Sequence, residues 1–244
     1  MSTLNSQIKL GIVCPMANEK DTVEEFVQDV FLHCKDYANV LMFTVLDNKS
    51  KDGTVDLLRE MAKKDLRIKV VWAPENRCVV DAYIRGYKEA IAAQCDWILE
   101  IDAGYSHQPS DIPRILQTMA QGYDCVFGSR FCKGGRCTDM PLKRYIISYG
   151  GSKLINLLLG TKLSDMTSGF ELFSRDALKD VLEKGIHSRA HFFQTEIKVH
   201  CRKRKITEVP IHYHNPSNNV NGSVLDDAFK NLGRLVRQRI KGVL

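Results

Sequence analysis

Short apolar runs alternate with amphipathic segments through the first half of the chain, and this alternation constrains the possible folds most strongly. Apolar side chains recur at helical spacing between the runs. The order predicts an α/β fold with a mostly parallel sheet and helices on both faces. The predicted strands cover residues 8–14, 40–46, 68–72, 97–101 and 125–127, and the predicted helices follow them at 21–31, 54–64, 79–92 and 112–120.

The second half is less regular. It predicts a helix over 141–159 that is interrupted at Gly150 and Gly151, a strand at 170–173, a helix at 191–202, a strand at 206–213, a polar loop at 214–223 and a basic helix at 226–241. No internal repeat or linker divides the chain. We therefore expect one domain over residues 1–225, followed by a C-terminal basic amphipathic helix over 226–244.

The formal net charge of +6 suits an anionic partner. Nucleic acid is excluded because the chain has no basic patch interleaved with aromatic residues. The eight cysteines include no CxxC pair, so we expect free thiols in a reducing cytoplasm; Cys132 and Cys137 lack the paired spacing of a zinc site.

Apolar runs of about ten residues are half the length of a membrane-spanning helix. The polar first ten residues do not resemble a signal peptide, which predicts a cytoplasmic protein.

Polar clusters stand where four of the predicted strands end, at residues 15–19, 47–54, 102–107 and 128–130. Parallel sheets bind ligands beyond the carboxyl ends of their strands, so the clusters predict one nucleotide-sized site. Asp47 can accept a hydrogen bond from a base or ribose, or it can only close a turn. Asp102 can bind Mg²⁺ or Mn²⁺ that bridges a diphosphate, or it can cap a helix.

A series of motifs then resembles the family 2 glycosyltransferases, and among them the dolichol-phosphate mannose synthases and other polyprenyl-phosphate glycosyltransferases. The resemblance covers about residues 8–225. It rests on the order of PMANE at 15–19, LDNKSKDGT at 46–54, EIDAGYSHQP at 100–109, FGSRFCKGG at 127–135, RYIISYGGSKLINLLLG at 144–160, DMTSGFELFSRDAL at 165–178, FFQTEI at 192–197 and ITEVPIHY at 206–213.

This resemblance implies a GT-A (Rossmann-like) fold. It also implies inverting transfer of a sugar from a nucleoside-diphosphate sugar, with GDP or UDP, to a dolichyl or undecaprenyl phosphate at the cytoplasmic membrane face. Two alternatives stay open: transfer to a saccharide hydroxyl, and a nucleotide-binding protein without turnover. The residues implied to bind the donor are Pro15, Ala17, Glu19, Asp47, Asp102, Gly104, Ser106 and Arg130, and those implied to face the acceptor phosphate are Arg144 and Ser148.

The chain departs from the family at the DxD motif, which reads Asp102-Ala103-Gly104. A Mg²⁺ or Mn²⁺ ion would therefore depend on Asp102, substrate phosphates and Ser106, or arginines would stabilise the leaving group without a metal. Asp165 either closes a turn or lies beside the acceptor. A sugar hydroxyl acceptor needs a base, for which Asp165 and Glu196 are candidates, whereas a phosphate monoester needs none. Asp102 and Asp165 are the catalytic candidates.

The C-terminal helix has an apolar stripe formed by Phe229, Leu232, Leu235, Val236, Ile240 and Val243, with Lys230, Arg234, Arg237, Arg239 and Lys241 around it. Such a helix can lie on an anionic membrane surface. It can also pack on its own domain or on a second copy of the chain as a homodimer. The membrane interpretation predicts a peripheral protein on the inner face.

Overall fold

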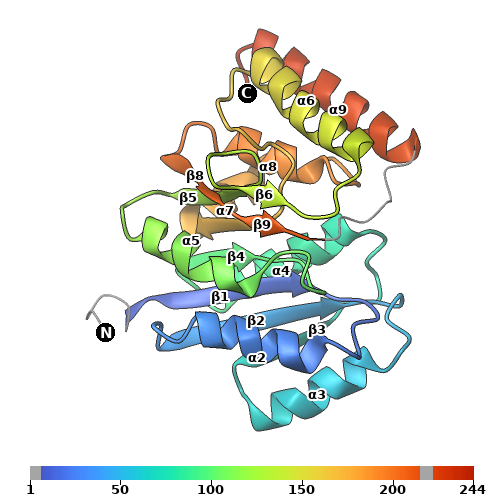
Figure 1. Ribbon diagram of the computed structural model, residues 1–244, viewed down its shortest axis with the longest axis vertical. Coiled ribbons are helices and arrows are strands. Elements are labelled where there is room, and N and C mark those ends of the chain that lie inside the picture. Colours follow the sequence, from blue (N-terminus) through green and yellow to red (C-terminus); the bar gives the residue numbers. More distant parts are fainter. Residues whose placement is uncertain (1–6, 215–221) are drawn as a thin grey trace.

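In the computed structural model, which describes residues 7–214 and 222–244, one seven-stranded sheet forms the centre of the molecule (Figure 1). The strand order is β3-β2-β1-β4-β7-β5-β8. β7 is antiparallel to β4 and β5, and the other pairs are parallel, which confirms the predicted mostly parallel sheet. The strands are β1 (Lys9–Pro15), β2 (Asn39–Leu46), β3 (Ile68–Trp72), β4 (Trp97–Glu100), β5 (Cys125–Ser129), β7 (Glu171–Ser174) and β8 (Ile206–Pro210).

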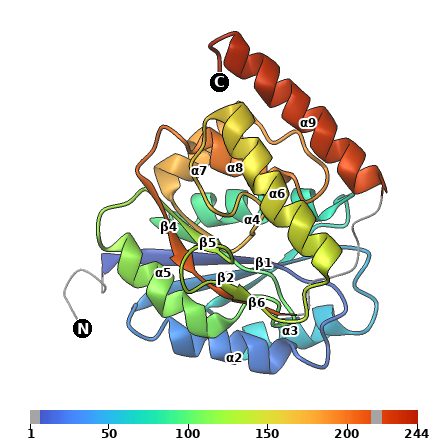
Figure 2. The ribbon, with the colours of Figure 1, turned by 45° about the horizontal axis from the view of Figure 1, so that its top comes forward.

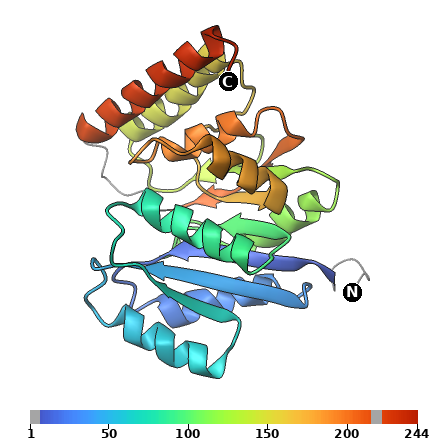
Figure 3. The same ribbon diagram turned by 180° about the vertical axis from the view of Figure 1, so that it is seen from behind.

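Helices cover both faces of the sheet, as the alternation predicts. Alternate side chains of β1 divide between two apolar layers, with Leu10 and Ile12 in one and Val13 in the other. The first layer contains α2 (Val23–His33), α3 (Thr54–Lys64) and α5 (Ile112–Met119), which follows the short 3-10 helix η1 (Pro109–Asp111). The second contains α4 (Val79–Ala92), α7 (Arg175–Lys184) and α8 (Phe193–His200), on the side seen in Figure 3.

Two longer helices, α6 (Leu142–Leu159) and α9 (Gly222–Ile240), lie side by side over one end of the molecule (Figures 1 and 2). The predicted interruption of α6 is wrong, because the helix continues through Gly150 and Gly151. α9 begins at Gly222, so the expected division between residues 225 and 226 falls inside a helix. Of the predicted 214–223 loop, residues 215–221 lie outside the described residues.

The apolar stripe of α9 is divided between the interior and the surface. Leu235 is fully buried and Leu232 is 8% exposed, whereas Phe229 and Ile240 are 65% and 81% exposed. Arg239 donates to the carbonyl of Leu158 at the end of α6. Part of the stripe and one of its cations therefore fasten α9 to the domain, as the packing alternative expects, and the rest of the stripe stays exposed.

Three further elements differ from the sequence predictions. The strand expected over 206–213 is divided into β8 and β9 (His212–Tyr213), and β9 pairs with β6 (Arg136–Cys137) in a loop for which no strand was predicted. α7 was also missed. Its start is defined by Ser174, whose side chain accepts a hydrogen bond from the amide of Ala177. All eight cysteines are free thiols, as expected.

Two carboxyl groups face each other inside the sheet. The antiparallel register of β4 and β7 places Glu100 opposite Glu171, and both are fully buried. The Tyr87 hydroxyl donates to Glu100, and the Lys198 ammonium donates to Glu171. Burial, and then the neighbouring Glu171, raises the pKa of Glu100 well above its ordinary value, and burial raises the pKa of Glu171 to about 7. The folded protein therefore retains protons that the unfolded chain loses.

We expect Gly86→Ala to destabilise the fold by about 1–3 kcal/mol, because a Cβ at Gly86 would overlap Val13 and lie 3.1 Å from Val45. The measurement is the free energy of unfolding in urea. The control is Gly150→Ala in α6, where no described heavy atom outside the local helix lies within 4 Å of the added Cβ. This change should stabilise the protein by about 0.5–1 kcal/mol. Equal effects of the two changes would contradict the close packing of α4 on the sheet.

We also expect the free energy of unfolding to fall as the pH rises from 4.5, because the unfolded chain then releases protons that Glu100 and Glu171 retain in the folded state. Glu100→Gln should reduce this fall by up to about 1.4 kcal/mol per pH unit, since it removes one titrating group and the like charge beside Glu171. Urea unfolding at pH 5, 6, 7 and 8 tests this. The same pH dependence in both proteins would show that Glu100 is ionised when folded.

Candidate functional site

A cavity of about 350 Å³ opens where β4 and β5 end, at the edge of the sheet to which the polar clusters were assigned. Because β7 is antiparallel, the segment that leads into it arrives at this same edge. The first residues of α6 and α9 and the start of α8 complete the wall. Its volume is typical of a small-molecule site. The lining includes Asp102, Ser106, Arg130, Arg144, Ser148, Ser168 and Gln194.

Asp102 stands two residues after the end of β4, and its side chain is 42% exposed. The Tyr83 hydroxyl from α4 donates to one carboxylate oxygen. The backbone N–H of Asp102 donates to Nδ1 of His107 at 3.2 Å, and His107 is buried against the ring of Phe170. Burial lowers the pKa of His107, which favours its neutral form. Asp102 thus lines the cavity and is held by two neutral side chains, Tyr83 and His107.

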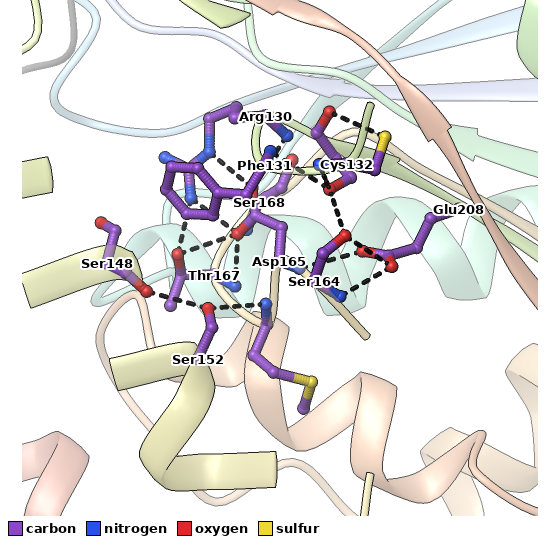
Figure 4. Close-up of polar contacts among 12 residues, drawn as sticks. Arg130, Phe131, Cys132, Ser148, Ser152, Ser164, Asp165, Thr167, Ser168 and Glu208 are labelled. Atoms are coloured by element: carbon purple, nitrogen blue, oxygen red, sulfur yellow. Dashed lines mark hydrogen bonds and ion pairs between the residues drawn. The ribbon is translucent and has the colours of Figure 1, made fainter. Parts of the chain in front are cut away.

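Arg130, directly after β5, forms a buried ion pair with Asp165 (Figure 4). The Arg130 Nε and Nη2 atoms donate to the two carboxylate oxygens at 2.7 and 2.8 Å, and the Arg130 amide adds a third bond. Asp165 also accepts from the amides of Thr167 and Ser168. Although burial opposes ionisation, the charge of Arg130 and these bonds hold the pKa of Asp165 at about 2. Asp165 is therefore an ionised carboxylate whose oxygens are already occupied.

The segment 164–168 also forms hydrogen bonds with β8 and α6. Glu208 of β8 accepts from the amides of Ser164 and Asp165 at 2.7 and 2.9 Å. Ser152 of α6 donates to the carbonyl of Ser148 and accepts from the amide of Met166 (Figure 4). These bonds connect β8 and α6 to the 164–168 segment, so the helix that carries Arg144 and Ser148 is held in a fixed position beside the sheet edge.

Arg144 and Ser148 lie one turn apart on α6, and both line the cavity. Arg144 is half-buried, and burial lowers the pKa of its guanidinium. Its Nη1 atom is buried and has no hydrogen-bond partner among the described residues. A desolvated guanidinium with a free donor is suited to a phosphate oxygen.

The predicted nucleoside-binding residues lie at the same sheet edge but do not line this cavity. Pro15 ends β1 and Asp47 follows β2, and the two strands are neighbours in parallel register. Asp47 is buried and accepts from the amide of Lys49 at 2.8 Å, so it does close a turn. Ala17 is exposed, and Glu19 is half-buried. The structure therefore brings Asp102, Ser106, Arg130, Arg144 and Ser148 together and places the others beside β1 and β2.

Gly104 has a left-handed backbone with φ of 71°, and a Cβ built there would lie 3.2 Å from Oε2 of Glu19. The carboxylate of Glu19 thus lies next to the position where the DxD motif would supply its second acid. No group of three or more metal-ligating side chains occurs within residues 7–214 and 222–244. Mg²⁺ needs only one or two protein carboxylates when phosphates and water complete its shell. Asp102, with Glu19 beside Gly104, fits that requirement.

Some lining residues were not identified from the sequence. Tyr83 and Gln194 were not assigned to the site, because both occupy helix positions that resemble ordinary core positions; Gln194 lies within the FFQTEI motif at 192–197, which could have indicated it. Val224, Leu225 and Ala228 of α9 also line the cavity. Glu196, the other candidate base, is buried away from it and accepts from Arg234 and the amide of Ser188. Of the two catalytic candidates, Asp102 lines the cavity and is partly free, whereas Asp165 is fully engaged.

Comparison with known protein families agrees with this site. The family model described as glycosyl transferase family 2 matches residues 11–182. The undecaprenyl-phosphate mannosyltransferase of Micrococcus luteus is 30% identical over 78% of this chain and 80% of that protein. The polyprenol monophosphomannose synthase of Mycolicibacterium smegmatis is 27% identical over 83% of this chain and 76% of that protein. The dolichol-phosphate mannosyltransferase of Pyrococcus furiosus is 29% identical over 84% of this chain but only 56% of that protein.

Solved structures with the same fold include glucosyl-3-phosphoglycerate synthase from Mycobacterium tuberculosis in complex with UDP. It aligns with a TM-score of 0.65 at 14% identity, covering 96% of this chain and 80% of that one. A complex of the same enzyme with Mn²⁺, UDP and glucosyl-3-phosphoglycerate aligns with a TM-score of 0.63 at 15% identity, covering 96% and 78%. These likenesses confirm the predicted GT-A fold. The chain belongs to glycosyl transferase family 2 and is a glycosyltransferase.

Proposed function

We propose that this glycosyltransferase moves a mannosyl group, with inversion, from a nucleoside-diphosphate mannose to the phosphate of a polyprenyl phosphate. The observation that carries the proposal is the composition of the cavity wall. The partly exposed carboxylate of Asp102 and the guanidinium groups of Arg130 and Arg144 line the same cavity. The names of three relatives, all polyprenyl-phosphate or dolichol-phosphate mannosyltransferases, support the choice of sugar and acceptor.

The donor would lie across the ends of neighbouring strands. Pro15, Ala17, Glu19 and Asp47 beside β1 and β2 would hold the nucleoside, and Asp102, Gly104, Ser106 and Arg130 would lie along the diphosphate. A Mg²⁺ or Mn²⁺ ion, when bound, would be held by Asp102 with Glu19 nearby and would neutralise charge on the diphosphate. The order of strands β2, β1 and β4 gives these groups a consecutive arrangement along the edge, except for Arg130, which follows β5 on the far side of β7.

The acceptor would be bound by Arg144 and Ser148. A phosphate oxygen of the lipid attacks the anomeric carbon, a new carbon–oxygen bond forms, and the bond to the diphosphate breaks with its electron pair leaving on the nucleoside diphosphate. A phosphate monoester is already anionic, so this step needs no general base. The engaged state of Asp165 agrees with that requirement, and we assign Asp165 the role of orienting Arg130 rather than accepting a proton.

We expect Asp102→Asn to lower lipid-phosphate-dependent release of nucleoside diphosphate at least 100-fold, because it removes the charge that would hold the metal and diphosphate. The thermal midpoint should change little, since Asp102 is 42% exposed and asparagine can still accept from Tyr83. Asp36→Asn is the matched control, at an exposed position before β2 on the opposite edge. Near-normal turnover of the Asp102 variant would remove this carboxylate from the mechanism.

The surface beside the cavity supports a lipid acceptor. α6 buries one face on the domain but exposes large apolar side chains on the other: Leu142, Tyr145, Ile146, Tyr149, Leu154 and Leu157. Phe229 and Ile240 of α9 are exposed as well. None of the described helices is long and apolar enough to cross a membrane. We propose that this exposed surface of α6 and α9 rests on the cytoplasmic face of a membrane, with nearby lysines and arginines facing anionic headgroups.

Co-sedimentation with phosphatidylglycerol vesicles tests this surface. Ile146→Glu combined with Leu157→Glu should reduce vesicle binding at least ten-fold, because both exposed side chains lie on the apolar side of α6. Leu66→Glu, a similarly exposed leucine between α3 and β3, should bind like the unmodified protein. Equal binding by all three proteins would contradict the membrane surface. A stable dimer that the double variant alone disrupts would instead assign the surface to a second copy of the chain.

A further inference from the structure

Three residues that line the cavity each contain a buried polar atom that has no hydrogen-bond partner within residues 7–214 and 222–244. These atoms are Nη1 of Arg144, Oγ of Ser168 and Oε1 of Gln194. Buried polar groups in folded proteins are nearly always paired, and leaving one unpaired is unfavourable. Three such atoms around one cavity indicate that a polar ligand completes their hydrogen bonds.

Ser168, Gly169 and Gln194 all line the cavity. Gly169 follows Ser168 in the chain, and a Cβ added at Gly169 would lie 2.6 Å from Nε2 of Gln194. Only glycine therefore allows the amide of Gln194 to lie against the 168–169 backbone. Ser168 is 2% exposed and Gln194 is 5% exposed, so neither side chain is hydrated as a surface residue would be.

The other polar groups of these two residues are occupied, which fixes their orientation. Nε2 of Gln194 lies in a hydrogen bond with Glu100, and Oε1 has no partner among the described residues. The Ser168 amide donates to Asp165, and the Ser168 carbonyl accepts from the Lys198 ammonium at 2.6 Å. The backbone of Ser168 and the side chain of Gln194 are thus held in place before any ligand arrives.

The order of the strands indicates which part of a ligand would meet them. Across the edge, β2 and β1 are followed by β4 with Asp102, then by β7, which Ser168 precedes, and then by β5 with Arg130. Neighbouring strands are about 4.8 Å apart, so the start of β7 lies about 10 Å from the end of β1. A donor with its nucleoside at β1 and β2 and its diphosphate at Asp102 would place its sugar near Ser168 and Gln194.

The chemistry of the two groups agrees with this placement. Arginine side chains bind phosphate, whereas a neutral hydroxyl and an amide oxygen are matched to a sugar hydroxyl, which can donate to Oε1 and accept from Oγ. We propose that Ser168 and Gln194 bind hydroxyl groups of the transferred sugar and so determine which sugar is accepted. This inference rests on the proposed function and adds the sugar-recognising residues to it.

The test combines Ser168→Ala with donors that each lack one hydroxyl. Unmodified protein is assayed with GDP-mannose or UDP-mannose, whichever binds more tightly, and with its 2-, 3-, 4- and 6-deoxy forms. We expect one deoxy donor to lose about ten-fold in kcat/KM with the unmodified protein and to lose little with Ser168→Ala, whose own kcat/KM for the full donor falls about ten-fold. Gln194→Met should show the same loss of discrimination.

Two readouts separate recognition from a structural role. Ser168→Ala removes an unpaired hydroxyl, so its thermal midpoint should not fall. Its affinity for the nucleoside diphosphate without sugar should also be unchanged. The matched control is Ser152→Ala, which removes a buried hydroxyl with two partners; its midpoint should fall, and its discrimination among deoxy donors should be retained.

The outcomes distinguish this inference from the function on which it rests. Suppose that the unmodified protein transfers mannose, and that Ser168→Ala and Gln194→Met have the same ratio of kcat/KM between the full donor and each deoxy donor as the unmodified protein. The sugar-recognition role is then wrong, and the proposed function stands. If the unmodified protein binds neither GDP nor UDP in a calorimetric titration, both are overturned.

Discussion

The buried ion pair between Arg130 and Asp165 is the interaction on which the geometry of the site depends. Asp165 accepts from the side chain and amide of Arg130 and from the amides of Thr167 and Ser168, so one carboxylate sets the path of the 164–168 segment. A buried carboxylate without these partners would be strongly destabilising. The pair therefore fixes the end of β5 and the approach to β7, and it holds in place Arg130 and the backbone of Ser168, two residues that line the cavity.

α6 connects this polar edge to the exposed apolar surface. Its buried face carries Ser148 and Ser152, and Ser152 is bonded to the 164–168 segment. Its opposite face exposes Ile146 and Leu157. One helix thus borders the proposed phosphate site and a surface suited to lipid. This arrangement is what an enzyme needs when its donor is soluble and its acceptor remains in a bilayer.

The sequence predicted the sheet edge because strand ends in a parallel sheet have a fixed relation to one another, and Asp102 and Arg130 each follow an apolar run directly. It did not predict that β7 runs antiparallel to its neighbours, because the sequence of a four-residue strand does not indicate whether the strand is parallel or antiparallel. Tyr83 and Gln194 were missed for a related reason, because their polar atoms are positioned by Asp102 and Glu100 from distant segments. The division of the α9 stripe likewise depends on packing against α6, which helical periodicity cannot reveal.

The most direct test of the account is a comparison of a polyprenyl phosphate with the polyprenol of the same chain length, under the same radiolabelled mannose donor. A site lined by Arg130 and Arg144, in which the candidate base Asp165 is engaged by Arg130, should act on the phosphate, which needs no base, and not on the alcohol. The account predicts label in the lipid extract only with the phosphate, as a product that mild acid hydrolyses. Comparable labelling of the polyprenol would contradict it, because that transfer requires a base that Asp165, in its ion pair with Arg130, does not provide.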